Sequence, residues 1–229
     1  MEFKHEPIML NECIENLNIK PDGIYVDGTI GGAGHSSKIV SKLSEKGLLI
    51  GIDRDEEALA ASQKRLKDFS NVKYIWGRHE DIKEHVNSLG IEKVDGILLD
   101  LGVSSYQIDE ATRGFSYTKD AMLDMRMNKE QELTAKEIVN SYSIQDLERI
   151  FFEYGEEKFS KKIASKIVRE REERIINTTY ELADIIRSAV PKNTVDSLKR
   201  IFQALRIEVN GELKELEKAI TSGIDILND

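Results

Sequence analysis

Hydrophobic positions in the first hundred residues follow two alternating spacings. Four short apolar, β-prone runs are separated by segments in which apolar residues recur every three or four positions, and an amphipathic segment precedes the first run. The runs are 24–26, 48–52, 72–76 and 96–99, and the helical segments are 3–17, 37–43, 56–66 and 82–89. Strands that alternate with helices in this way predict an α/β fold with a parallel sheet covered on both faces.

After Gly102 this alternation stops. Residues 104–127 are irregular and rich in turn residues, and 134–190 shows only helical spacings. A break at Pro191 precedes one long amphipathic helix expected over 197–220. The pattern predicts a sheet domain made of residues 1–105 and 199–229, from which the last strands are missing. Residues 106–198 are predicted to form an inserted all-helical domain.

Composition narrows the class of protein. The chain has 229 residues, of which 40% are hydrophobic, so it can bury a core. Its one cysteine, Cys13, rules out an internal disulfide, and no Cys/His spacing is typical of a zinc site. The N-terminus lacks the features of a signal peptide, and no apolar run is long enough to span a membrane. We therefore expect a soluble cytoplasmic protein without a metal.

Charge is unevenly distributed along the chain. The net charge is −9, but residues 158–206 contain 12 Lys and Arg against 6 Asp and Glu. This basic stretch is a candidate surface for phosphate groups in the helical domain. A pair of solvated helices with an incidental charge bias would give the same count.

A glycine-rich turn follows the first predicted strand. That strand ends at Asp27, four glycines stand in residues 28–34, and Ser36 begins a helical pattern. Glycine lets the backbone approach a ligand closely, and the free N–H groups at a helix start favour a polar or anionic group. Asp53 ends the next strand, at about the offset of a ribose-binding acid in a nucleotide-binding βαβ unit. The stretch predicts a nucleoside site.

The spacing of the glycines discriminates between two cofactors. A dinucleotide fingerprint needs a third glycine where Ser37 stands. Its absence argues against the hypothesis that the protein is an NAD(P)-linked oxidoreductase. S-adenosylmethionine has no pyrophosphate and suits a looser turn, with Asp27, Gly31, Gly34 and Asp53 around it. Chain reversal and helix capping would explain the same residues without a ligand.

A third carboxylate, Asp100, ends the fourth predicted strand. Since ligands of parallel sheets lie beyond the carboxyl ends of the strands, Asp100 is expected beside the nucleoside. It is placed to contact the methionyl end of the donor or the incoming nucleophile.

Several motifs in order resemble the RsmH (MraW) family. They are Asp27-Gly28-Thr29, Gly34-His35-Ser36, Ile52-Asp53-Arg54-Asp55, Asp95 to Ser105, Arg113-Gly114-Phe115-Ser116, Leu123 to Met127 and Phe202 to Ile207. The family consists of S-adenosylmethionine-dependent methyltransferases that act on the N4 amine of a cytosine in the decoding region of bacterial 16S ribosomal RNA. The resemblance implies a Rossmann-like class I methyltransferase domain interrupted by a helical domain. It runs from His5 to about Leu216.

The resemblance also implies site residues. The cofactor contacts that it carries over are Ala33, Gly34, His35, Asp53, His79, Asp100 and Gln107. An aromatic residue is common in the family at the position of His79, and proline is usual where Tyr106 stands. Family members continue with a C-terminal part that this sequence lacks, so the chain resembles an incomplete member.

The implied reaction is an in-line attack of the cytosine amine on the sulfonium methyl group. That amine is a weak nucleophile, so the protein must supply hydrogen-bond acceptors and close alignment. Asp100 is the first candidate for the catalytic acceptor and Asp124 the second.

The RNA candidates are Arg113 and Arg126 for flanking phosphates and Lys161, Lys162, Lys166 and Arg169 for the backbone. The partner expected is 16S rRNA in the small subunit; a non-catalytic remnant that keeps only the nucleoside site or RNA surface is the alternative.

Overall fold

The computed structural model describes residues 7–228, so His5 and the start of the helix predicted over 3–17 lie outside the described residues. The chain forms two compact units. One consists of Met1–Ser104 with Leu213–Asp229, and the other of Ser105–Glu212. The sequence places the return to the sheet domain at residue 199, and the structure places it at Leu213, because helix α10 (Thr194–Asn210) packs with the helical unit.

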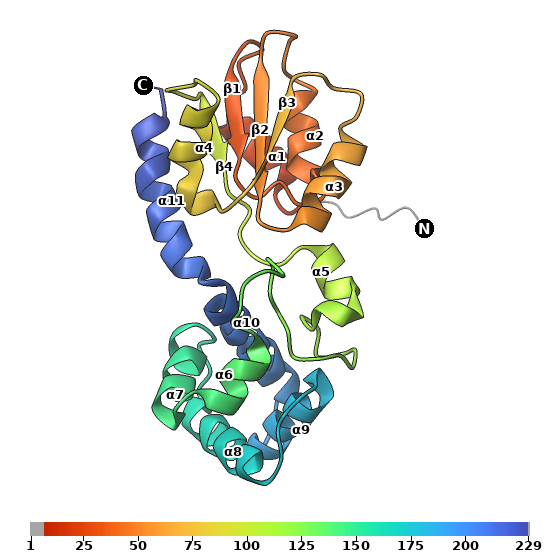
Figure 1. Cartoon of the computed structure of the whole chain (residues 1–229), viewed down its shortest axis with the longest axis vertical. Coiled ribbons are helices and arrows are strands. Elements are labelled where there is room, and N and C mark those ends of the chain that lie inside the picture. The colour runs from red at the N-terminus through yellow and green to blue at the C-terminus, as the bar shows by residue number, and fades with distance from the viewer. Residues whose placement is uncertain (1–6, 229) are drawn as a thin grey trace. The chain divides into compact units, whose positions relative to one another are not determined.

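The first unit contains a four-stranded parallel sheet. Its strands are β1 (Ile24–Asp27), β2 (Leu48–Asp53), β3 (Val72–Trp76) and β4 (Gly96–Leu98), in the order β3-β2-β1-β4 (Figure 1). The parallel α/β fold expected from the alternation is confirmed. The chain moves outward from β1 to β3 and then returns to the other side of β1, so the switch point lies between β1 and β4.

Alternate side chains of the strands bury into two cores, one on each face of the sheet. Tyr25 and Leu49 pack with helices α1 (Leu10–Asn16), α2 (Gly34–Val40) and α3 (Glu56–Arg65). Val26 and Ile50 pack on the other face with α4 (Ile82–Ser88) and the end of α11 (Glu212–Ile226) (Figure 1). This period of two follows from the pleat, which sends successive side chains to opposite faces.

The chain returns to the sheet after α11. Leu227 forms a parallel bridge with Val94. The Val94 N–H donates to the Ile226 carbonyl at 2.8 Å, and the Val94 carbonyl accepts from the Asn228 N–H at 2.9 Å. Residues 227–228 thus lie beside the segment that leads into β4 (Figure 1).

The second unit is built from helices. Its short elements are α5 (Ser105–Asp109) and the 3₁₀ turn η2 (Ala111–Arg113); its longer helices are α6 (Ala135–Ser141), α7 (Ile144–Glu153), α8 (Ser160–Glu173), α9 (Thr179–Ala189) and α10. Capping boxes begin two of them: Thr134 with Glu137 at α6 and Thr178 with Glu181 at α9. The predicted helical domain is present, and α5 and η2 fall in the stretch predicted to be irregular.

The single helix predicted over 197–220 is wrong. The structure contains α10 and α11 instead, and Gly211 separates them as the C-cap of α10 with φ +63°. The apolar spacing continues across this position, which is why the pattern predicts one helix. Glycine readily adopts the left-handed conformation that ends a helix.

Candidate functional site

The carboxylate of Asp27 lies at the end of β1, beneath the glycine-rich turn. It is 1% exposed and accepts hydrogen bonds from Ser36 Oγ at 2.6 Å and from the Thr29 N–H at 3.2 Å. Burial raises the pKa of Asp27 to about 6, although both hydrogen bonds oppose the rise. Asp27 therefore ties the start of the turn to the first turn of α2 and does not face solvent.

Asp53 holds the tip of the same turn. Its Oδ2 accepts the Gly31 N–H at 2.9 Å and its Oδ1 accepts the Asp55 N–H at 2.9 Å. Burial raises the pKa of Asp53 as well. Gly31 has φ +49°, and Ala33, which is fully buried, has φ +58° just before Gly34 opens α2. The predicted cofactor residues of β1 and β2 are thus joined in one hydrogen-bonded loop.

Asp100 follows β4 on the other side of the switch point. Its N–H donates to Thr29 Oγ1 at 2.7 Å, and its Oδ2 lies 3.6 Å from His35 Nδ1. The Asp100 side chain is 41% exposed, whereas that of His35 is 6% exposed. Of the three carboxylates at the strand ends, Asp100 is the one most open to a substrate.

His79 begins the 3₁₀ turn η1 (His79–Asp81) after β3. The ring is 7% exposed, and a Cβ added to Gly28 would lie 3.3 Å from the His79 Cβ, so the two positions are adjacent. Burial, together with the nearby charge of Arg54, lowers the pKa of His79 to about 4, so the ring is neutral at neutral pH. Its Nε2 is buried and has no hydrogen-bond partner among the described residues.

A buried charge cluster stands behind His79. Glu215 of α11 is 2% exposed and pairs with Arg54; it lies 3.0 Å from Arg78 Nε and 3.8 Å from His79 Nδ1. Arg54 follows Asp53 directly, so this cluster connects the segments after β2 and β3 to α11. Glu215 is not recognisable as a site residue from the sequence, because its neighbours come from 130 or more residues earlier in the chain and no local pattern marks it.

Three further contributors are missed. Ser36 donates a hydrogen bond to Asp27, and Thr29 accepts one from the Asp100 N–H. Both residues lie inside motifs that resemble the family, and this position is the signal that could identify them. Trp76 stands opposite Asp53 in the β2–β3 register; it is 45% exposed and its Nε1 donates to the Arg54 carbonyl at 3.0 Å. The exposed indole ring extends the site by an apolar surface.

The chemistry of these groups fits an adenosine-bearing donor. Each Asp53 oxygen accepts one backbone N–H, which leaves lone pairs for the two ribose hydroxyls. The orphaned Nε2 of neutral His79 can pair with a polar group of a base. Asp27, Gly31, Ala33 and Gly34 shape the turn between them.

The second catalytic candidate, Asp124, lies in the helical unit. Arg126 donates to its Oδ1 from Nε at 2.8 Å and to its Oδ2 from Nη2 at 2.8 Å, and the Arg126 N–H adds a third bond at 3.0 Å. Although burial works in the opposite direction, these bonds hold the pKa of Asp124 below its ordinary value. The pair fixes the loop after η2, and the geometry gives Asp124 a structural role there.

Arg113 and Arg126 are both committed to this loop. Arg113 is 4% exposed and donates from Nη2 to the carbonyls of Arg126 and Met127 at 3.0 Å each. Arg126 also donates to the carbonyls of Lys129 and Gln131. Neither guanidinium is placed to hold an RNA phosphate. Gln107 lies in α5 and is 5% exposed.

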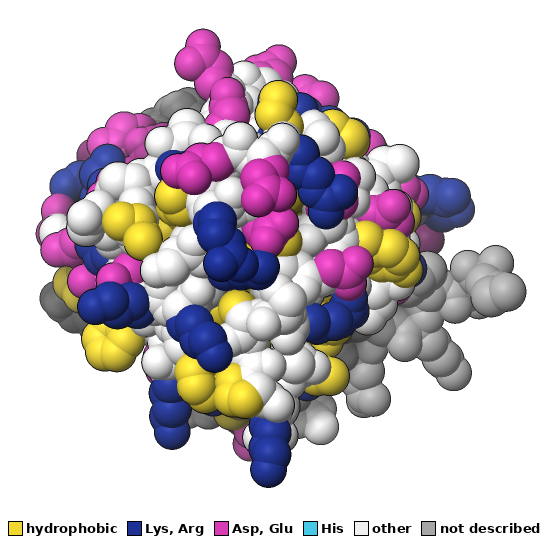
Figure 2. Space-filling view, turned by 90° about the horizontal axis from the view of Figure 1, so that it is seen from below, with side chains coloured by type: hydrophobic (Ala, Val, Ile, Leu, Met, Phe, Trp, Pro, Cys, Tyr) yellow, Lys and Arg dark blue, Asp and Glu magenta, His cyan; other side chains and the backbone are white. Residues whose placement is uncertain are grey.

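The basic residues predicted for RNA lie on α8. Lys161, Lys162 and Arg169 are exposed, and Lys166 is half-buried. The helical unit faces the viewer in Figure 2, where Asp and Glu gather in the upper part of the view and Lys and Arg dominate the lower part, among hydrophobic and uncharged groups. The exposed cations of α8 thus account for part of the basic excess of residues 158–206.

Across residues 7–228 no helix is long and apolar enough to cross a membrane. No cluster of three or more His, Cys, Asp or Glu side chains in that range could hold a metal ion.

The parallel α/β fold and the strand-end site fit a Rossmann-like methyltransferase with S-adenosylmethionine as its methyl donor. The chain belongs to the MraW methylase family, whose model matches residues 2–229. The family resemblance of the motifs is thereby confirmed, and the NAD(P)-linked alternative is set aside.

Curated relatives agree. The chain is 56% identical to "Ribosomal RNA small subunit methyltransferase H" of Clostridium botulinum (strain Loch Maree / Type A3) over 231 residues. It is 51% identical to the protein of that name from Clostridioides difficile (strain 630) over 234 residues and 53% identical to that of Finegoldia magna. Each alignment covers 100% of this chain and 75% of the relative.

Proposed function

We propose that this chain transfers a methyl group from S-adenosylmethionine to the N4 amine of a cytosine in the decoding region of 16S ribosomal RNA, within the small ribosomal subunit. The observation that carries the proposal is the 51–56% identity, over the whole chain, to proteins named ribosomal RNA small subunit methyltransferase H. The family resemblance of the sequence motifs supplies the base and the region of the RNA.

The residues of the sheet unit divide between binding and positioning. When bound, S-adenosylmethionine supplies an electrophilic methyl group on a sulfonium. Asp53 is proposed to accept hydrogen bonds from the ribose hydroxyls and His79 to face the base. Asp27, Gly31, Ala33 and Gly34 form the turn that lies against the donor, and His35 supports Asp100 from the protein side.

Asp100 is proposed as the catalytic acceptor. The lone pair of the cytosine amine is delocalised into the ring, so the amine becomes a better nucleophile when an anionic acceptor takes a hydrogen bond from its N–H. The Asp100 carboxylate is exposed, and the hydrogen bond from its N–H to Thr29 fixes its backbone. A fixed carboxylate is easier to align with the amine than a mobile one. As the new C–N bond forms and the methyl–sulfur bond breaks to leave a neutral thioether, the amine proton is expected to leave toward this carboxylate.

Recognition of the RNA falls to both units. The cytosine must leave its stack to reach a strand-end site, which suits a loop or single-stranded segment. Gln107 of α5 is retained as a proposed cofactor contact. Lys161, Lys162, Lys166 and Arg169 are proposed to contact the backbone, whereas Arg113 and Arg126 are proposed to shape the loop that carries Asp124.

The experiment is transfer of a labelled methyl group onto small subunits from cells that lack the modification. Incorporation of label into 16S rRNA supports the proposal. A family-length relative in the same assay serves as the positive control, and label with the relative but none with this chain favours the non-catalytic alternative.

A further inference from the structure

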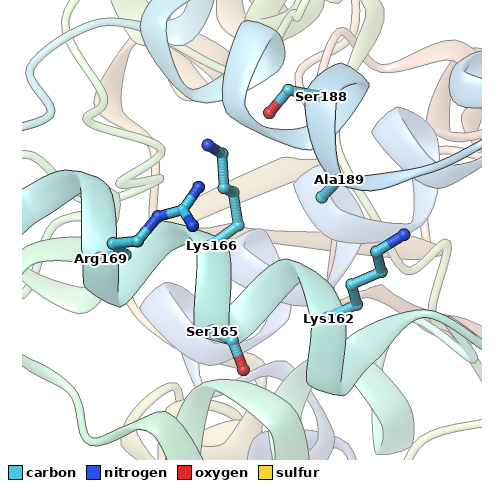
Figure 3. Close-up of a pocket in the computed structure, with 6 residues that line it drawn as sticks. All are labelled: Lys162, Ser165, Lys166, Arg169, Ser188 and Ala189. Atoms are coloured by element: carbon cyan, nitrogen blue, oxygen red, sulfur yellow. The ribbon is translucent and has the colours of Figure 1, made fainter.

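A cavity lies between two helices of the helical unit. It has a volume of about 290 Å³ and lies where the middle of α8 faces the end of α9 (Figure 3). Its lining residues are Lys162, Ser165, Lys166, Arg169, Ser188 and Ala189.

Three cationic side chains come from one face of α8. Lys162, Lys166 and Arg169 are spaced by four and three residues, which places them on neighbouring turns of one face. In Figure 3 the Lys166 amine points toward Ser188, and the guanidinium of Arg169 lies beside Lys166. The Ser165 hydroxyl points away from the other labelled groups and donates to the Lys161 carbonyl at 2.8 Å.

The wall contributed by α9 is uncharged. The Ser188 hydroxyl donates to the Ile185 carbonyl at 2.7 Å, so its oxygen is left as an acceptor, and Ala189 adds a methyl group. Asp184, one turn earlier on α9, pairs with Arg187 at 2.7 Å. The charge of the cavity therefore comes from α8.

Glu170 offsets part of this charge. Its carboxylate lies 2.6 Å from Lys166 Nζ and 3.9 Å from Arg169 Nη2. Because one carboxylate stands against three cations, the described part of the cavity keeps a net positive charge. An anion that enters would compete with Glu170 for Lys166 and Arg169, and Lys162 adds a further positive charge to the lining.

We propose that this cavity seats a backbone phosphate of the substrate RNA, at a contact separate from the methyl-transfer site; the proposal rests on the proposed function. Cations without an aromatic wall suit a phosphodiester better than a base or an apolar ligand. The planar Arg169 fork can bind two phosphate oxygens, and the lysines act as point charges. Lys166 and Arg169, whose charged groups lie side by side in Figure 3, are the direct phosphate ligands, and Lys162, whose amine points to the other side of the view, adds positive charge to the lining.

The test compares the variant K162Q/K166Q/R169Q with the wild-type protein. Binding of a labelled RNA that contains the decoding region is measured by titration over a series of salt concentrations. Single-strand binding gains about 0.7 in the salt slope per neutralised phosphate, so losing the contact with one phosphate should lower the slope by about 0.7 and the affinity about 5-fold at 0.1 M salt. An unchanged slope and affinity overturn the proposal.

The matched control is K42Q/K64Q/K67Q, which removes the same charge from three exposed lysines of the sheet unit. It should keep the wild-type affinity and the wild-type slope. An equal loss in both variants would show that net charge alone matters, and that result also contradicts the cavity. Calorimetric titration with S-adenosylhomocysteine checks that both variants keep the donor site.

A further arm identifies the source of the phosphate. Titration with CMP separates a free nucleotide from RNA: saturable CMP binding that the triple variant loses, with no change in the RNA salt slope, assigns the cavity to a nucleotide and contradicts the proposal. Binding is measured without turnover, so a wild-type protein that fails to methylate the RNA contradicts the proposed function alone.

Discussion

The carboxylate of Asp100 lies 3.6 Å from Nδ1 of His35, whose Nε2 lies 3.0 Å from the Ile8 carbonyl. A carbonyl only accepts, so Nε2 carries the proton of that hydrogen bond, and Nδ1 is the ring atom on the side of Asp100. The His35 ring, held by the Ile8 carbonyl, thus stands against one side of the Asp100 carboxylate. The Asp100 side chain, which is 41% exposed, stays open to the amine of a substrate.

Replacement of Asp100 tests its role as the acceptor. D100N keeps the size and removes the charge, so kcat for methyl transfer should fall by about 100-fold or more. Affinity for S-adenosylhomocysteine, measured by calorimetry, should change much less than kcat. A D100N protein that turns over at the wild-type rate would remove Asp100 from the mechanism.

Asp53 should govern donor affinity. D53N replaces one acceptor oxygen with an N–H group, which cannot accept from Gly31 or Asp55 and loses a bond to a ribose hydroxyl. Hydrogen bonds to charged groups contribute about 1.5–3 kcal/mol, so S-adenosylhomocysteine should bind roughly 10- to 100-fold more weakly. D68N, at an exposed acid of the same unit, is the control and should bind like the wild type. Equal affinities for D53N and D68N would refute the assignment.

Asp27 should make folding stability depend on pH. Its pKa is about 6 in the folded protein against an ordinary value of 3.8, so the native state holds the proton more tightly than the unfolded chain. Its burial therefore costs nothing below about pH 4 and progressively destabilises the protein as the pH rises toward 6. A shift of this size corresponds to about 3 kcal/mol.

The measurement is urea unfolding of wild type and D27N at several pH values between 4 and 7. D27N cannot titrate, so the difference in unfolding free energy should shift in favour of D27N as the pH rises. Contributions from His79 and other groups cancel in this difference. A difference that stays constant over the range contradicts a raised pKa at Asp27.

The Asp124–Arg126 pair should stabilise the helical unit. Removing either side chain breaks a two-pronged ion pair that is about three-quarters buried, and a double-mutant cycle of D124A and R126A should give a coupling of about 1–2 kcal/mol. The folded D124N protein should keep most of its kcat. A loss as large as that of D100N would instead restore Asp124 to the chemistry.

The sequence predicts the sheet well because its signals are local. Runs such as Leu48–Asp53 are short, apolar and bounded by turns, and the Asp27 and Asp53 positions follow from where such runs end. The hydrophobic pattern does not show which charged side chains are buried. The sequence predicts that Arg113 binds a phosphate, but its guanidinium donates to two carbonyls of the loop. The Glu215 cluster requires contacts between distant segments, and the break at Gly211 depends on the conformation of a single residue.

The identity of the base that receives the methyl group tests the proposed function most directly. Small subunits lacking the modification are incubated with this protein and labelled S-adenosylmethionine, and the 16S rRNA is digested to nucleosides for mass spectrometry. The account predicts label in N4-methylcytidine from the decoding region, and its loss with D100N. Label on another base, or outside that region, would contradict it.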